Sequence, residues 1–151
     1  MKRSVFVLLL AILIFAGCSS QPGEIALEKT MENGVWNKFT PLTWDSVVIP
    51  AHGPYQLVLE IEKDSRFVSE QLIFQLISES HSGEMRNQVF ELPIANFEVA
   101  EHQDPNLQFL RKDLEAAGSF APNGIYHIEF ISLMPYLETP GVHKIRLILR
   151  K

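Results

Sequence analysis

Apolar and polar side chains alternate with a period of two in three long segments of the chain. Residues 55–62 place Leu57, Leu59 and Ile61 on one side and polar residues opposite, with Val58 as the one exception. Residues 125–131 and 143–150 repeat this pattern, and the last segment carries its basic residues on the second face. Alternation of this kind is typical of a β-strand with one buried face. These three segments are therefore predicted to be half-buried strands.

Shorter apolar runs between turn residues predict further strands. Residues 45–49, 71–78, 87–92 and 95–100 read in this way, with Phe97 and Val99 expected on the same side. The run at 71–78 is more uniformly apolar, which indicates a central strand covered on both faces or a bulged one. Residues 107–117 fit either a short helix or a strand and a loop, and residues 24–31 fit a short helix only loosely.

This spacing of strands and turns indicates an all-β fold. Turn residues recur about every 8–12 positions, which is typical of an antiparallel β-sandwich of about seven or eight strands. A closed barrel is the alternative architecture. Residues 35–151 are enough for one domain and leave no room for a second.

The N-terminus follows a different pattern. Lys2 and Arg3 precede a continuous apolar run over residues 5–15, and Ala16, Gly17 and Cys18 follow. The run is shorter than the roughly 20 residues needed to span a bilayer, but it has the length of a secretory signal. Small residues before a cysteine allow cleavage and lipidation, so Cys18 is the predicted lipidation site.

Cys18 is also the one cysteine of the sequence, whereas structural cysteines of secreted proteins come in pairs. The predicted organisation is a lipoprotein signal peptide over 1–17, a lipid anchor and tether over 18–34, and the sandwich domain over 35–151. Without Lys2 and Arg3 the formal charge changes from −5 (13 − 18) to −7 (11 − 18). An acidic domain argues against nucleic-acid binding, so membrane attachment is expected through hydrocarbon.

No motif of the sequence indicates catalysis, a metal or a cofactor. The five histidines lack the spacings of zinc sites, and no Gly-x-Ser-x-Gly turn is present. His127 and His143 lie near the starts of the last two strands, where they would be either half of a metal site or, as we expect, two surface histidines. The sequence therefore predicts a protein that is not an enzyme.

Aromatic residues suggest where the domain binds a partner. Trp36 and Trp44 are expected in the core, although exposed aromatics on a sandwich can also stack on sugar rings. Tyr136 and Leu137 lie in a loop that contains two prolines, which reduce the entropy lost on docking. These two residues are the predicted partner contact.

The C-terminal third resembles a known family. The stretch Pro122-Asn-Gly-Ile-Tyr-His-Ile-Glu-Phe130, followed by Leu133-Met134, Gly141-Val142 and a final alternating strand, resembles the end of the GldH-type gliding-motility lipoproteins of the Bacteroidetes. The early Val35-Trp36-Asn37 segment and the residues before Cys18 are similar too. The resemblance departs at Pro135 and in residues 101–119.

The resemblance implies a lipid-anchored, non-catalytic component of an envelope machine for gliding motility or associated secretion, with other envelope proteins as partners. A lipid-anchored carbohydrate-binding module is the alternative, and an envelope enzyme is a third hypothesis. Ser19 after the cysteine lacks the aspartate that favours retention in the inner membrane. We therefore expect an anchor in the outer membrane that faces the periplasm.

Overall fold

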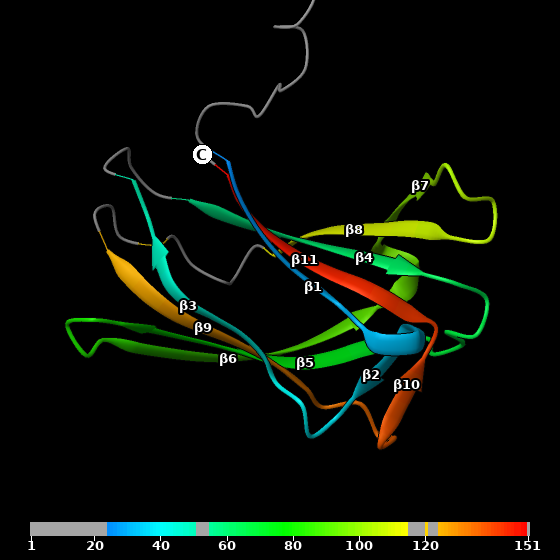
Figure 1. The fold of residues 1–151 in the computed structure, drawn as a ribbon, viewed down its shortest axis with the longest axis horizontal. Coiled ribbons are helices and arrows are strands. Elements are labelled where there is room, and N and C mark those ends of the chain that lie inside the picture. Colours follow the sequence, from blue (N-terminus) through cyan, green and yellow to red (C-terminus); the bar gives the residue numbers. More distant parts are fainter. Residues whose placement is uncertain (1–23, 51–54, 115–119, 121–123, 151) are drawn as a thin grey trace, which may run out of the picture.

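The computed structural model describes residues 24–50, 55–114, 120 and 124–150, and its strands form two stacked antiparallel sheets (Figure 1). Cys18 and the predicted signal peptide lie outside these residues. The five-stranded sheet has the order β1 (Ile25–Thr30), β11 (Val142–Arg150), β4 (Gln56–Lys63), β8 (Gln108–Leu114) and β7 (Glu98–Glu101). The four-stranded sheet has the order β3 (Leu42–Val48), β9 (Ile125–Ser132), β5 (Gln71–Ser80) and β6 (Met85–Pro93).

A small two-stranded sheet of β2 (Val35–Asn37) and β10 (Glu138–Pro140) completes the architecture, together with the 3₁₀ turns η2 (Glu32–Gly34) and η3 (Ile94–Asn96). The predicted antiparallel β-sandwich is confirmed. The described residues hold eleven strands where seven or eight were expected. The additional strands are β1, β2 and β10, and the last two have only three residues each, too few to show an alternating pattern.

The N-terminal boundary of the sandwich differs from the prediction. Residues 25–30 were assigned to the tether, with a short helix as a loose fit, but they form β1 and pair with β11 from Ile25↔Leu149 to Thr30↔Lys144. Met31, which follows, is buried in the core. β1 is an edge strand with a mostly polar exposed side, so its sequence resembles a linker although its backbone completes a sheet.

Two ambiguous segments are strands. Residues 108–114 form β8 between β4 and β7, so the helical alternative for this region is wrong. β5 lies between β9 and β6 without a bulge, and its two faces differ: one is buried while the other is half-exposed. The apolar residues on its second face lie on the outer surface of the sandwich, so this strand is not covered on both sides.

The core lies between the two large sheets and is built by the alternating strands. The predicted inward faces of β4, β9 and β11 are all buried. The rings of Phe74 and Phe130 stack at 4.2 Å, and Trp36 packs against Phe130 at 5.4 Å. Phe97 is buried, whereas Val99 is 63% exposed. Val99 pairs with the buried Leu110 and so shares its face, but β7 is the short edge strand of the sheet and leaves the Val99 side chain uncovered.

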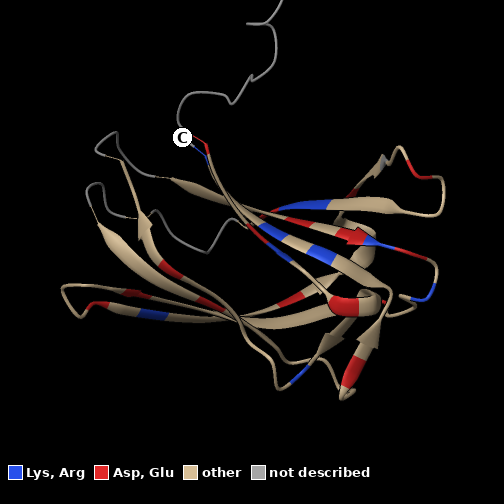
Figure 2. Cartoon of the chain, viewed as in Figure 1, with Lys and Arg blue, Asp and Glu red and all other residues tan. Residues whose placement is uncertain are grey.

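The outer face of the five-stranded sheet carries a row of opposite charges. Arg146 lies between Glu28 and Glu60, at 3.2 Å from each, and Arg111 contacts Glu60 at 3.0 Å. These residues lie in register across β1, β11, β4 and β8, where Figure 2 shows blue and red bands in alternation. The carboxylates of β4 are thus part of a surface ion-pair network, which favours this strand order.

Candidate functional site: an apolar rim of three loops

Four exposed apolar side chains come from three loops at one end of the sandwich. Tyr136 and Leu137 precede β10, Phe39 follows β2, and Val68 lies between β4 and β5. Their exposed fractions are 64%, 55%, 79% and 86% respectively. We call these four residues the apolar rim. Exposed apolar residues that gather in this way, rather than lying singly, are typical of an interaction surface.

Backbone hydrogen bonds hold two of these loops together. The amide of Lys38 donates to the carbonyl of Leu137 at 2.9 Å, next to the register pair Asn37↔Glu138 of β2 and β10. The side-chain oxygen of Asn37 accepts a hydrogen bond from the amide of Phe39 at 2.9 Å. These contacts fix Phe39 and Leu137 as neighbours without burying either side chain.

The third loop reaches the rim across a shallow groove of about 390 Å³ between Val68 and Tyr136. Met134 forms its base: this residue is fully buried, and its sulfur accepts a hydrogen bond from the amide of Ile73 at 3.3 Å. The remaining lining comes from the polar residues Ser69, Glu70 and Gln71 and from the apolar residues Ile73 and Pro135. The buried side chain of Met134 fixes the loop that carries the exposed Tyr136 to the core. The position of the apolar rim is therefore held by core packing.

The predicted exposure of Tyr136 and Leu137 is confirmed, whereas their contact with a partner stays a prediction. Phe39 and Val68 were not among the residues predicted from the sequence. Each is a large apolar residue inside a segment of turn-forming or polar residues, which was the available signal.

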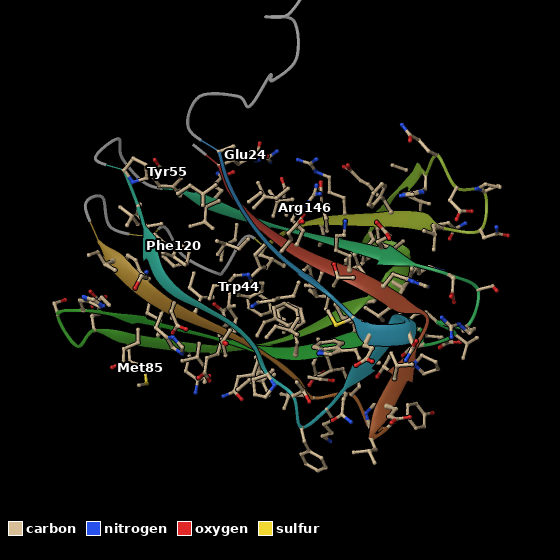
Figure 3. All side chains as sticks on the ribbon, viewed as in Figure 1. Glu24, Trp44, Tyr55, Met85, Phe120 and Arg146 are labelled. Atoms are coloured by element: carbon tan, nitrogen blue, oxygen red, sulfur yellow. The ribbon has the colours of Figure 1, made fainter. Side chains whose placement is uncertain are left out.

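The other aromatic candidates do not form a binding surface. Trp36 is 1% exposed, so its predicted place in the core is confirmed. Trp44 is half-buried, and its indole nitrogen donates to the carbonyl of Glu28 at 3.4 Å, which links the edge strands β3 and β1. Figure 3 shows Trp44 beneath β1, between the two sheets. Tyr55 and Tyr126 are buried.

The two histidines proposed as sheet neighbours lie in different sheets. His127 is on β9, and its ring contacts Asp45 at 2.6 Å and Glu129 at 3.0 Å. These carboxylates, Glu129 foremost, raise the pKa of His127 above its usual value. His143 is on β11 and contacts Asp64 at 2.7 Å. The half-metal-site alternative for this pair therefore fails.

Asp64 joins three segments at the corner beside β11. Its carboxylate accepts hydrogen bonds from the backbone and guanidinium of Arg66 at 2.8 and 2.9 Å, and it contacts His143. Arg66 also donates to the carbonyl of Asn33 at 3.3 Å. Hydrogen bonds from Arg66, and then from His143, hold the pKa of Asp64 well below its usual range. The groups satisfy one another, so this cluster acts as a structural clamp.

Within the described parts of the chain, no group of three or more His, Cys, Asp or Glu residues is placed to hold a metal ion. The same residues include no helix with the length and hydropathy of a membrane span.

Comparison with known protein families finds no matching family model, and none of the curated proteins compared is similar enough to match. Among solved structures, the chain is similar to a family 35 carbohydrate binding module from Clostridium thermocellum, with 14% sequence identity and a TM-score of 0.38. The superposition covers 84% of this chain and 93% of that one. The function of the apolar rim therefore has to be inferred from its own residues.

Proposed function

We propose that this protein is a lipid-anchored, non-catalytic binding subunit of the bacterial envelope. Cys18 carries the lipid and holds the domain on the periplasmic face of the outer membrane. The apolar rim docks a protein partner. The resemblance to GldH-type lipoproteins indicates where that partner belongs: a gliding-motility machine or the secretion system associated with it.

The position of the apolar rim relative to the N-terminal strand carries this proposal. Glu24, at the start of β1, lies on the upper side of the molecule in Figure 3, and β2 and β10 beside the rim lie at the lower right in Figure 1, on the opposite side. Glu24 follows Cys18 by six positions, and a fully extended chain of that length spans at most about 22 Å. An anchor at Cys18 thus holds the Glu24 end near the membrane and leaves the rim on the side facing away.

The composition of the rim favours a protein partner. Tyr136 and Phe39 are large aromatic side chains, a class enriched among residues that dominate binding energy. Pro135 and Pro140 flank the Tyr136 loop and restrict its backbone before binding, which lowers the entropy lost on docking. A carbohydrate-binding role is the second candidate, because the ring of Tyr136 lies beside the polar groups of Ser69 and Gln71 in the groove.

The test is a crosslinking pull-down of the tagged full-length protein from its native membrane, compared between the wild type and Y136A/L137A. We expect the wild-type protein to recover gliding or secretion proteins in stoichiometric amounts. The double variant should recover at least ten-fold less of them. Its thermal unfolding midpoint should change little, because both side chains are mostly exposed. Val48→Ala, another exposed apolar residue, is the matched control and should retain binding.

Different outcomes separate the candidates. Retention on envelope polysaccharide that Y136A abolishes, without a protein partner, supports the carbohydrate role. A fall of many degrees in the unfolding midpoint of Y136A/L137A would show that these residues support the fold. Recovery of bulk outer-membrane proteins alone, equal for wild type and variant, contradicts docking through the rim.

A further inference from the structure

β6 is an edge strand with an open backbone. Its nine residues pair with β5 in unbroken register, from Gln71↔Pro93 to Glu79↔Met85. No described residue outside β5 is hydrogen-bonded to the backbone of residues 87–93. In an antiparallel edge strand, alternate residues direct their N–H and C=O groups away from the sheet. This edge can therefore accept a further strand.

The other edges of the two large sheets are interrupted. β3 has a register shift between Trp44 and Val47, where Ser46 adopts a φ of 55°. The β1 edge is reached by the indole of Trp44, which donates to Glu28. β7 is only four residues long. Bulges, side-chain caps and short strands are the usual devices against edge pairing. They are found on these three edges, whereas the middle of β6 has none.

The outward row of β6 is complementary to itself. Asn87, Val89 and Glu91 point to the outer face, and Val89 is 52% exposed between two polar residues. Antiparallel pairing of two copies about Val89 sets Val89 against Val89 and Asn87 opposite Glu91. The side-chain oxygen of Asn87 already accepts from Gln75 at 2.8 Å, so its amide nitrogen can donate across the interface. Glu91 has no ion pair with any described residue and would accept that hydrogen bond.

We propose that two copies of this protein pair through their β6 edges, with a two-fold axis at Val89, and join their four-stranded sheets into one continuous sheet. The pairing adds main-chain hydrogen bonds, and it covers the exposed valine of each copy with that of its mate. This inference does not depend on the partner of the apolar rim.

The symmetry of this pairing fits a shared membrane. Antiparallel strands that continue one sheet are related by an axis normal to that sheet. Rotation about this axis leaves the five-stranded sheet, and with it β1 and Glu24, on the same side of the joined sheet in both copies (Figures 1 and 3). Both N-termini therefore approach the membrane from one side. Confinement to a membrane also raises the effective concentration of each copy for the other.

The test places a single cysteine at the proposed axis of the full-length protein in its native membrane. Directly opposed residues have Cβ atoms about 4.5–5.5 Å apart, close to disulfide geometry. We expect V89C to form a disulfide-linked dimer under mild oxidation. M85C is the matched control: Met85 is exposed on the same face, but its two copies would lie eight residues apart, roughly 27 Å. Wild type measures any contribution of Cys18.

Two further variants check the register and the association itself. The double variant N87C/E91C should crosslink, because its cysteines oppose one another across the axis, whereas E91C alone should crosslink far less. V89K places two like charges at the axis and should halve the mass of the detergent-solubilised protein in sedimentation, with little change in unfolding temperature. Crosslinking of V89C no stronger than that of M85C, or a monomeric mass for wild type, would overturn the proposal.

Discussion

Asp64 shows how one side chain can organise a corner of a β-sandwich. It lies in the turn after β4, yet its hydrogen-bond partners belong to that turn and to β11, and through Arg66 they extend to η2. Hydrogen bonds to charged groups contribute more than neutral ones, about 1.5–3 kcal/mol each when partly sheltered. The carboxylate is therefore important to the fold without belonging to an apparent chemical site.

The stability contributed by Asp64 should depend on pH in a defined direction. Because its folded pKa lies below the ordinary value of 3.8, its contribution is complete above that value and is lost as the pH falls towards the folded pKa. We expect D64N to lower the free energy of unfolding by about 1–3 kcal/mol at pH 7 and by much less at pH 2. Denaturant titrations at both pH values measure this difference.

Asp113→Asn is the control for this measurement. Asp113 forms an ion pair with Arg150 at 2.6 Å, but both side chains are substantially exposed, so its removal should cost less than about 1 kcal/mol. If D64N destabilised the protein equally at pH 7 and pH 2, the stabilising role of the ionised carboxylate would be refuted.

For single residues, the sequence predicts which side chains are exposed better than it predicts which of them lie next to one another. Two prolines beside an aromatic residue were enough to predict that Tyr136 is exposed, because a proline-rich loop rarely enters a core. Phe39 and Val68 join it only through the pairing of β2 with β10 and the path of the β4–β5 loop. Pairing of that kind depends on chain segments about 100 residues apart, which local pattern does not encode.

At the scale of elements, the turn between β10 and β11 requires a glycine. Gly141 has a φ of +83°, and a Cβ at this position would collide with the backbone nitrogen of Phe67 and lie 2.8 Å from Asp64 Oδ1. Its backbone also pairs with two neighbours, donating to Gly34 and accepting from Asp64. The three loops therefore approach one another too closely at position 141 to leave room for a side chain there.

Replacement of Gly141 by alanine should lower the free energy of unfolding far more than replacement of a glycine that has a similar φ but no close neighbours. Gly83 has a φ of +87°, and a Cβ added there would have no atom within 4 Å, so G83A should cost only about 1–2 kcal/mol for the left-handed backbone. G141A adds a backbone clash and should lower the free energy of unfolding by several kcal/mol. Equal unfolding midpoints for the two variants would contradict the packing described here.

The sequence predicts a strand well where the strand is long and only one of its faces is buried. β4, β9 and β11 each turn one apolar face to the core and a mostly polar face outward, although Val58 and Ile148, which pair on the outer face of β4 and β11, are also buried. β8 was ambiguous because Leu107, Leu110 and Leu114 match helical spacing by coincidence, although the strand places Leu110 and Leu114 on its buried face. β1 was missed because an edge strand with a polar outer side needs little hydrophobic pattern of its own.

At the scale of the whole molecule, the inclusion of β1 changes where the folded domain begins. A soluble chain that starts at Glu24 retains β1 and Met31, whereas a chain that starts at Val35 loses six residue pairs with β11 and a buried side chain. We expect the shorter chain to unfold at least 10 °C lower or to fail to fold, and the longer chain to unfold cooperatively. Equal thermal midpoints would show that β1 is dispensable and that the tether extends to residue 34.

The same strand decides how the molecule would respond to force. With the proposed anchor at Cys18 and the proposed partner on the apolar rim, a pull between the two would run roughly along β1, which leads from the N-terminal side of the domain towards η2 and β2 (Figure 1). Load applied parallel to a strand shears its hydrogen bonds with β11 together, instead of opening them one after another as in a zipper. In the proposed arrangement, tension would be carried by the six residue pairs of β1 and β11 acting in parallel.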